Sequence, residues 1–280
     1  MSTRILLTGA TGFVGRHILS ELLKINADIT LVVRDELKLE PSLPVNRIIR
    51  TDDAFAQSKS WWVEALQGID LVIHAAWFAE HGLYLESPIQ LDCLKGTITL
   101  AQACVDASVR RFVGIGTCFE YDTDAGYLSV NTPLRPETSY ASAKAATYMA
   151  LNQFLPKTGV EFLWCRLFYL YGEGEDPRRL VPYIHQQLQR REFADLTDGL
   201  QIRDYMNVRD AAVSIVAAAC GKFTGPLNVC SGKGITIREL AEQIAHTYES
   251  PELLRFGARS RNIHDPKTIV GISHQTSFRE

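Results

Sequence analysis

The chain has 280 residues and a hydrophobic content of 46%, so it is long enough to bury a large core in one domain or in two closely fused ones. Its formal net charge of -3 excludes the positive field that nucleic-acid-binding domains carry and offers no polybasic anchor for an anionic membrane. The six cysteines include no C-x-x-C pair, and no closely spaced Cys/His set occurs, so we expect reduced thiols and no metal site.

The N-terminal residues also bear on location. They run directly into an apolar strand, without the charged and apolar regions of a secretory signal. No apolar run approaches the roughly 20 residues that span a bilayer. We therefore expect a cytoplasmic protein that makes no use of membranes.

Short apolar runs alternate with amphipathic stretches in the first part of the chain. Residues 4–8 predict a strand, and residues 12–23 predict a helix whose apolar side chains share one face. The alternation continues with strands at 28–33, 47–50, 69–75, 111–115 and 161–168 and helices at 61–66, 89–107 and 140–154. Steady alternation with strands that are apolar throughout predicts an α/β fold, a doubly wound parallel sheet of the Rossmann type.

The second part of the chain is more mixed. It predicts helices at 179–190, 209–219 and 237–248, a loop at 197–203 and a strand at 227–230. We expect a Rossmann-type NAD(P)-binding domain over residues 1–168, to which residues 204–230 return, and a smaller, mixed substrate-binding lobe made mainly of residues 169–280. Because no long linker separates the two parts, they should share an interface with a cleft between them.

Three glycines follow the first predicted strand at a spacing of three residues. Between a strand and a helix, such glycines permit a tight turn, a close approach of the backbone to a pyrophosphate and close packing of helix on strand. The start of the helix adds free N–H groups and a partial positive charge. The pattern predicts a dinucleotide site, and the plainer alternative is a glycine-rich turn without a ligand. The predicted contacts are Gly9, Thr11, Gly12, Phe13, Val14 and Gly15.

Arg34 ends the second predicted strand, where cofactor choice is usually decided. An acidic residue there binds the ribose 2′-hydroxyl of NAD, and a basic one accommodates the 2′-phosphate of NADP. We therefore favour NADP, with NAD as the alternative if Asp35 binds the ribose instead. Four further cofactor contacts are predicted after the third and fourth strands: Asp52, Asp53, Ala75 and Ala76.

Tyr140 and Lys144 lie four residues apart and therefore share one face of a predicted helix. A free tyrosine titrates at about pH 10, and a neighbouring ammonium together with a nicotinamide cation favours the phenolate. Tyr140 could then exchange a proton with a substrate oxygen near working pH, while Lys144 holds the nicotinamide ribose. The same spacing also arises by chance, as an interface tyrosine beside a solvated lysine.

The glycine motif and the Tyr140-x-x-x-Lys144 motif together resemble those of the extended short-chain dehydrogenases/reductases, in the group of NAD-dependent nucleotide-sugar epimerases, dehydratases and reductases. The likeness runs from residue 4 to about residue 272, and segments 116–121, 166–172 and 201–210 also carry it. The resemblance implies an NAD(P)-dependent enzyme with a nucleotide-sugar substrate. It also implies a homodimer formed through the helices at 89–107 and 140–154.

The resemblance also implies roles for individual residues. Thr117 takes the place of the family's Ser or Thr that hydrogen-bonds the reacting carbonyl, so Thr117, Tyr140 and Lys144 are the expected catalytic residues. The expected substrate contacts are Cys118, Phe119, Tyr169, Arg203 and Arg261.

The residues after Thr117 distinguish reactions within the family. Dehydratases carry Asp-Glu there, whereas this chain has Cys118 and Phe119. Epimerases that act beside a keto group place a cysteine at the position of Phe119. The resemblance therefore favours an NADPH-dependent reductase of a nucleotide-linked 4-keto-6-deoxyhexose, similar to the CDP-abequose and CDP-paratose synthases. The alternatives are a nucleotide-sugar 4-epimerase with tightly bound NAD and a non-catalytic dinucleotide-sensing module. Relatives continue through a further helix, so we expect that either this sequence is short or the substrate lobe is reduced at its C-terminus.

Overall fold

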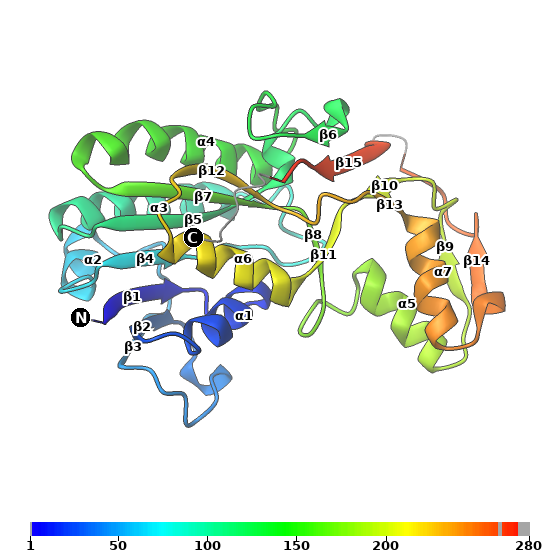
Figure 1. Cartoon of the computed structure of the whole chain (residues 1–280), viewed down its shortest axis with the longest axis horizontal. Coiled ribbons are helices and arrows are strands. Elements are labelled where there is room, and N and C mark those ends of the chain that lie inside the picture. Colours follow the sequence, from blue (N-terminus) through cyan, green and yellow to red (C-terminus); the bar gives the residue numbers. More distant parts are fainter. Residues whose placement is uncertain (1, 263–264, 274–280) are drawn as a thin grey trace.

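The computed structural model describes residues 2–262 and 265–273, and its main feature is a parallel sheet of seven strands (Figure 1). From edge to edge the strands are β12 (Gly225–Val229), β7 (Glu161–Leu167), β5 (Arg111–Thr117), β4 (Leu71–His74), β1 (Thr3–Thr8), β2 (Ala27–Val33) and β3 (Arg47–Arg50). The chain winds outward from β1 in one direction and then restarts at β4 on the other side of β1. The predicted Rossmann-type sheet is confirmed, and the reversal between β1 and β4 is where such sheets bind ligands.

Helices cover both faces of this sheet. They are α1 (Phe13–Leu22) and α6 (Val208–Cys220) on one face, and α2 (Lys59–Ala65), α3 (Ile89–Asp106) and α4 (Ser139–Phe154) on the other. In Figure 1, α4 lies above β7 in the view, and α1 and α6 lie next to each other. Successive strand residues belong to different cores, since Leu6 packs with α2 and α3 whereas Leu7 packs with α1 and α6. Two buried faces explain why the strands are apolar throughout. No helix in the described part of the chain is both long and apolar enough to cross a membrane.

A smaller, mixed region lies beyond the sheet, on the side to which β1 points in Figure 1. Its elements are β8 (Tyr169–Tyr171), α5 (Leu180–Gln189), β9 (Ala194–Leu196), β10 (Ile202–Arg203), β11 (Tyr205–Asn207), β13 (Ile235–Thr236), α7 (Ile237–Thr247), β14 (Leu254–Phe256) and β15 (Thr268–Gly271), with β6 (Tyr127–Leu128) joining from the first half. The sequence predicts the two helices but none of these strands, because strands of two to four residues show no periodicity. Residues 274–280, the end of the predicted lobe, lie outside the described residues.

Asp204, between β10 and β11, connects the large sheet with the smaller region. Its buried carboxylate accepts hydrogen bonds from the backbone and hydroxyl of Ser231 (2.8 and 2.6 Å), from the backbone of Gly232 (2.9 Å) and from that of Gly271 (3.1 Å). Ser231 follows β12 of the large sheet closely, and Gly271 ends β15 of the small one. A single side chain therefore fixes the small strands relative to the carboxyl ends of the large sheet.

Candidate active site

The glycine loop joins β1 to α1 directly beside the end of β4. Gly9 has φ +75°, and a Cβ there would lie 2.5 Å from the backbone nitrogen of Ala76. A Cβ on Gly15 would overlap the carbonyl oxygen of Gly9. Gly12 is the N-cap of α1 and, having no side chain, leaves the first N–H groups of the helix without a side-chain acceptor. The loop thus has the close backbone approach and the open helix start that a dinucleotide pyrophosphate requires.

The other predicted cofactor residues surround this loop. Thr11, Phe13 and Val14 are half-buried in the same turn, and Ala75 and Ala76 follow β4. Arg34 is exposed at the end of β2, and Asp52 and Asp53 are exposed after β3. The carboxylate of Asp35 accepts a hydrogen bond from the backbone of Leu37 (3.0 Å) and caps a short helical turn. Of the two neighbours at the end of β2, Arg34 is therefore the one whose side chain is not engaged in capping that turn.

The side chain of His74 connects the elements that flank the glycine loop. Its ring is buried, with Nδ1 at 2.8 Å from the hydroxyl of Thr8 and Nε2 at 3.0 Å from that of Thr97. Burial lowers the pKa of His74 to about 3, so the ring is neutral. It links β1, β4 and α3, which fixes the backbone that faces Gly9.

Thr117, Tyr140 and Lys144 come together at the carboxyl end of β5. Thr117 is the last residue of that strand, and Tyr140 and Lys144 lie in the first turns of α4, whose N-cap Thr138 accepts a hydrogen bond from Ala141. The half-buried Tyr140 ring meets Tyr84 edge to face, with 4.8 Å between centroids. Three residues distant in the sequence are thus placed around one point.

The protein's own groups favour the neutral form of Tyr140. Burial raises its pKa above the usual value, Tyr84 and Glu120 act in the same direction, and a hydrogen bond with Thr117 opposes them. The sequence predicts the opposite shift, because it anticipates a charged lysine and a nicotinamide cation. That prediction concerns the state with a nicotinamide bound, whereas desolvation by the protein's own groups keeps Tyr140 protonated.

Lys144 is only 3% exposed, and its surroundings explain its charge state. Its Nζ donates a hydrogen bond to the carbonyl of Ile115 (2.5 Å) and lies 3.7 Å from the centroid of the Trp77 ring. Burial lowers the pKa of Lys144 to about 7, while the charge of Glu120 opposes this shift. Small electrostatic changes around Lys144 therefore decide whether it is charged at neutral pH.

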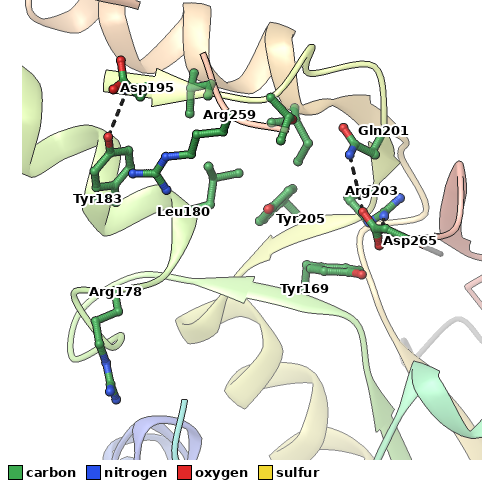
Figure 2. A pocket seen from close by; sticks show the side chains of 13 residues that line it. Tyr169, Arg178, Leu180, Tyr183, Asp195, Gln201, Arg203, Tyr205, Arg259 and Asp265 are labelled. Atoms are coloured by element: carbon green, nitrogen blue, oxygen red, sulfur yellow. Dashed lines mark hydrogen bonds and ion pairs between the residues drawn. The ribbon is translucent and has the colours of Figure 1, made fainter. Parts of the chain in front are cut away.

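A cavity of about 490 Å³ opens in the smaller region (Figure 2). It combines tyrosine rings, guanidinium groups and carboxylates, and its lining consists of Tyr169, Arg178, Leu180, Tyr183, Asp195, Leu196, Thr197, Gln201, Arg203, Tyr205, Ile237, Arg259 and Asp265. Arg203 is buried, with its Nη2 at 2.7 Å from Oδ1 of Asp265. The guanidinium of Arg259 lies over the Tyr183 ring, 4.6 Å from its centroid. Such a lining suits a ligand with a flat ring and anionic oxygens.

The expected substrate residues differ in how they meet this cavity. Tyr169 and Arg203 line it, and Phe119 packs edge-on against Tyr169, with 6.0 Å between centroids. Because Phe119 comes two residues after Thr117, this contact joins the catalytic group to the cavity. The side chain of Cys118 is buried among apolar residues, which raises the pKa of its thiol to about 12. Arg261 is not among the described residues that line the cavity.

Several residues that line the cavity are not predicted by the sequence analysis. Gln201 and Tyr205 belong to segment 201–210, whose family resemblance is a usable signal. Arg178, Tyr183 and Arg259 have no such signal, because they come from the loop before α5, from α5 and from the segment after β14.

Comparisons with known proteins agree with this geometry. Residues 5–228 match the model of the NAD dependent epimerase/dehydratase family. The chain is 24% identical to dTDP-6-deoxy-L-talose 4-dehydrogenase (NAD(+)) of Aggregatibacter actinomycetemcomitans, over 91% of this chain and 96% of that protein. It is 27% identical to the uncharacterized UDP-glucose epimerase YtcB of Bacillus subtilis, over 76% and 72% of the two chains.

Solved structures share the fold. The UDP-N-acetylglucosamine 4-epimerase of Methanobrevibacter ruminantium superposes with a TM-score of 0.86 at 21% identity, covering 98% of this chain and 90% of that one. DesIV, a dTDP-glucose 4,6-dehydratase of Streptomyces venezuelae whose structure contains NAD, superposes with a TM-score of 0.82 at 22% identity, covering 97% and 88%. The chain belongs to the NAD-dependent epimerase/dehydratase family of extended short-chain dehydrogenases/reductases and is an NAD(P)-dependent enzyme.

Proposed function

We propose that the protein is an NADPH-dependent reductase that acts on the 4-keto group of a nucleotide-linked 4-keto-6-deoxyhexose. The observation that carries this proposal is the meeting of Thr117 and Tyr140 at the end of β5, next to a glycine loop on one side and a charged, aromatic cavity on the other. A relative named for oxidation at C4 of a dTDP-linked 6-deoxyhexose supports the choice of substrate class.

The cofactor is held by residues from two strand ends and from α4 in this proposal. The backbone from Gly9 to Gly15 receives the pyrophosphate, Arg34 pairs with the 2′-phosphate of NADP, and Lys144 donates hydrogen bonds to the nicotinamide ribose. When bound, the nicotinamide supplies the hydride. The exposed position of Arg34 supports NADP over NAD, because a guanidinium there matches a phosphate and not a hydroxyl.

The substrate occupies the cavity, with its sugar toward Phe119. Arg203 and Arg259 pair with the diphosphate, and the tyrosine rings pack against the base and sugar. Thr117 and Tyr140 donate hydrogen bonds to the carbonyl oxygen, and Tyr140 transfers its proton to that oxygen. This assignment makes residues 1–168 with 204–230 the cofactor domain and residues 169–280 mainly the substrate lobe.

The second candidate is a nucleotide-sugar 4-epimerase that keeps its NAD bound. Relatives and structural neighbours named as 4-epimerases favour it, and the same three catalytic residues would serve the reaction.

The test is NADPH oxidation, followed by absorbance at 340 nm, with CDP-, dTDP- and GDP-linked 4-keto-6-deoxyhexoses and with NADH in parallel. We expect turnover with one nucleotide and a preference for NADPH. No oxidation with any of them, together with interconversion of intact nucleotide hexoses without added cofactor, would replace the reductase with the 4-epimerase.

We also propose that the protein forms a homodimer through α3 and α4. These helices pack side by side and expose apolar side chains to solvent, with Leu91 at 67% and Met149 at 59% exposure. Sedimentation should show a dimer for the native chain and a monomer for the Leu91→Glu/Met149→Glu variant. A native monomer would contradict this proposal.

A further inference from the structure

An ion pair lies fully buried directly beneath the catalytic residues. Glu120 is 0% exposed and Arg166 1%, with Nε of Arg166 at 2.6 Å from Oε2 of Glu120. The indole N–H of Trp164 also donates to this carboxylate, at 3.0 and 3.1 Å from its two oxygens. Burying two charges is expensive even when they are paired, and apolar residues of similar size often stabilise a core equally well. The location of the pair therefore calls for an explanation beyond packing.

Glu120 fixes the backbone at the catalytic threonine. The N–H of Thr117 donates to Oε1 of Glu120 (2.8 Å), and the Thr117 hydroxyl accepts a hydrogen bond from the backbone of Phe119 (3.3 Å). The two residues form a capping box around the short helical turn Cys118–Glu120. A Cβ on Gly116 would overlap Oε1 of Glu120, so the carboxylate lies hard against the end of β5.

Glu120 also lies near Lys144. The ammonium of Lys144 binds the carbonyl of Ile115, and Glu120 binds the N–H of Thr117, two residues further along β5. Nζ of Lys144 also lies 5.9 Å from the ring of Trp164, whose indole N–H donates to Glu120. The titratable groups that act on or feel this ammonium are Glu120 from the turn after β5, Cys93 from α3, His74 from β4 and, four residues away on the same helix, Tyr140. His74 is neutral, and burial raises the pKa values of Cys93 and Tyr140, which keeps both protonated. Among these groups only the carboxylate of Glu120 favours the charged form of Lys144 near neutral pH.

We propose that Glu120 is a positioning residue that orients Thr117 through its backbone and holds Lys144 in the charged state that supports catalysis. Arg166 pairs with Glu120 and keeps its carboxylate in place. From Arg166 a chain of hydrogen bonds continues through the hydroxyl of Tyr121 (2.9 Å) to Oδ1 of Asn228 (2.7 Å) on β12, which anchors the arrangement in the large sheet. The catalytic benefit rests on the proposed function, whereas the effect on Lys144 does not.

The first test uses no substrate. Because Nζ of Lys144 lies 3.7 Å from the Trp77 ring centroid and 5.9 Å from that of Trp164, its protonation should change tryptophan emission. A fluorescence titration of the native protein should show a transition near pH 7, which Lys144→Met abolishes and Trp77→Phe reduces. Glu120→Gln keeps an acceptor for the Thr117 N–H but removes the charge, so the midpoint should fall by about one pH unit.

A matched control distinguishes a change in the pKa of Lys144 from the general effect of removing the carboxylate partner of a buried arginine. Glu161 pairs with the fully buried Arg111 (2.8 Å) at the opposite end of the same sheet, far from Lys144 in the topology. Glu161→Gln should leave the fluorescence midpoint at its native value. If Glu120→Gln does not fold because Arg166 is left unpaired, Glu120→Gln/Arg166→Met removes both charges. Its midpoint should also fall, but by less, because the opposing charge of Arg166 is lost as well.

The second test is the pH dependence of kcat/KM in the reductase assay. Activity that needs charged Lys144 is lost as pH rises through the pKa of that group, so Glu120→Gln should lose activity at lower pH than the native enzyme. An unchanged fluorescence midpoint in Glu120→Gln, or failure of the double variant to fold while Glu161→Gln folds, would overturn the inference. If NADPH is not oxidised with any ketosugar, only the proposed function is overturned, because the fluorescence titration uses no substrate.

Discussion

The glycine loop beside the ends of β1 and β4, called the crevice below because ligands bind at this point of such sheets, and the cavity of the smaller region are built in opposite ways. The crevice is made by backbone: Gly9 and Gly15 leave no room for a Cβ, and the helix start offers N–H groups. The cavity is made by side chains, and its lining comes from positions as far apart as Tyr169 and Asp265. A backbone site imposes a fixed spacing of glycines on the sequence, whereas a side-chain site imposes no spacing at all.

Replacing the residue between the two regions should have the largest effect. Tyr140→Phe removes the proton donor and nothing else from the crevice, so kcat should fall about 10²–10⁴-fold while the Kd for NADPH stays close to native. Steady-state kinetics and a fluorescence titration with NADPH measure the two quantities. Tyr127→Phe, at an exposed tyrosine of β6, is the matched control and should leave both unchanged. Native turnover in Tyr140→Phe would remove Tyr140 from the reaction.

The backbone character of the crevice can be tested with one methyl group. Gly9→Ala should abolish detectable NADPH binding, because the added Cβ would lie 2.5 Å from the backbone nitrogen of Ala76. Gly82 has a similar φ of +83° but nothing within 4 Å of the added Cβ, so Gly82→Ala isolates the cost of the backbone conformation. That variant should lose about 1–2 kcal/mol of unfolding free energy and still bind NADPH. Equal NADPH affinities for the two variants would show that the close approach at Gly9 is unimportant.

Substrate binding in the cavity should depend on charged side chains, whereas cofactor binding at the glycine loop depends on the room for a methyl group. Arg203→Met/Asp265→Asn removes the buried arginine together with its half-buried partner, so that neither is left unmatched. We expect the KM for the nucleotide sugar to rise roughly 10–100-fold, from the loss of charge-assisted hydrogen bonds. The KM for NADPH should not change. The control is Arg178→Met, at an arginine that pairs with Asp176 on the surface, where a smaller effect is expected. A rise in the KM for NADPH instead would mean that the two regions are not separate.

The smallest effect concerns cofactor choice at the edge of the crevice. Arg34→Ser should raise the KM for NADPH about tenfold, the value of one lost charge-assisted contact, and leave that for NADH unchanged. Arg50→Ser, at an exposed arginine paired with Val33 in the neighbouring strand, should alter neither. If Arg34→Ser and the native protein discriminate equally between NADPH and NADH, Arg34 does not read the 2′-phosphate.

Most of the large sheet is predictable from the sequence. The strand at 47–50 is predicted to the residue, and those of β1 and β2 to within one residue, because the apolar residues of each strand are bounded by a helix or a turn. The convergence of Thr117 and Tyr140 is predictable only through family resemblance, since no local pattern brings residue 117 to residue 140. The short strands and most of the cavity are not predictable, because pairs such as Ile202–Arg203 are stabilised by partners more than 30 residues away. The direction of the Tyr140 pKa shift depends on burial, which a linear motif does not report.

The pairing of β15 with β6 sets the order in which the nascent chain can be completed. Tyr127 and Leu128 pair with Val270 and Gly271, which the ribosome adds roughly 140 residues later. At about 5–20 residues per second, that interval is on the order of ten seconds. Every strand of the large sheet has been synthesised once Val229 is added, before Gly271 exists to donate its hydrogen bond to Asp204. During translation the crevice for the dinucleotide can therefore form while the neighbouring cavity is still incomplete.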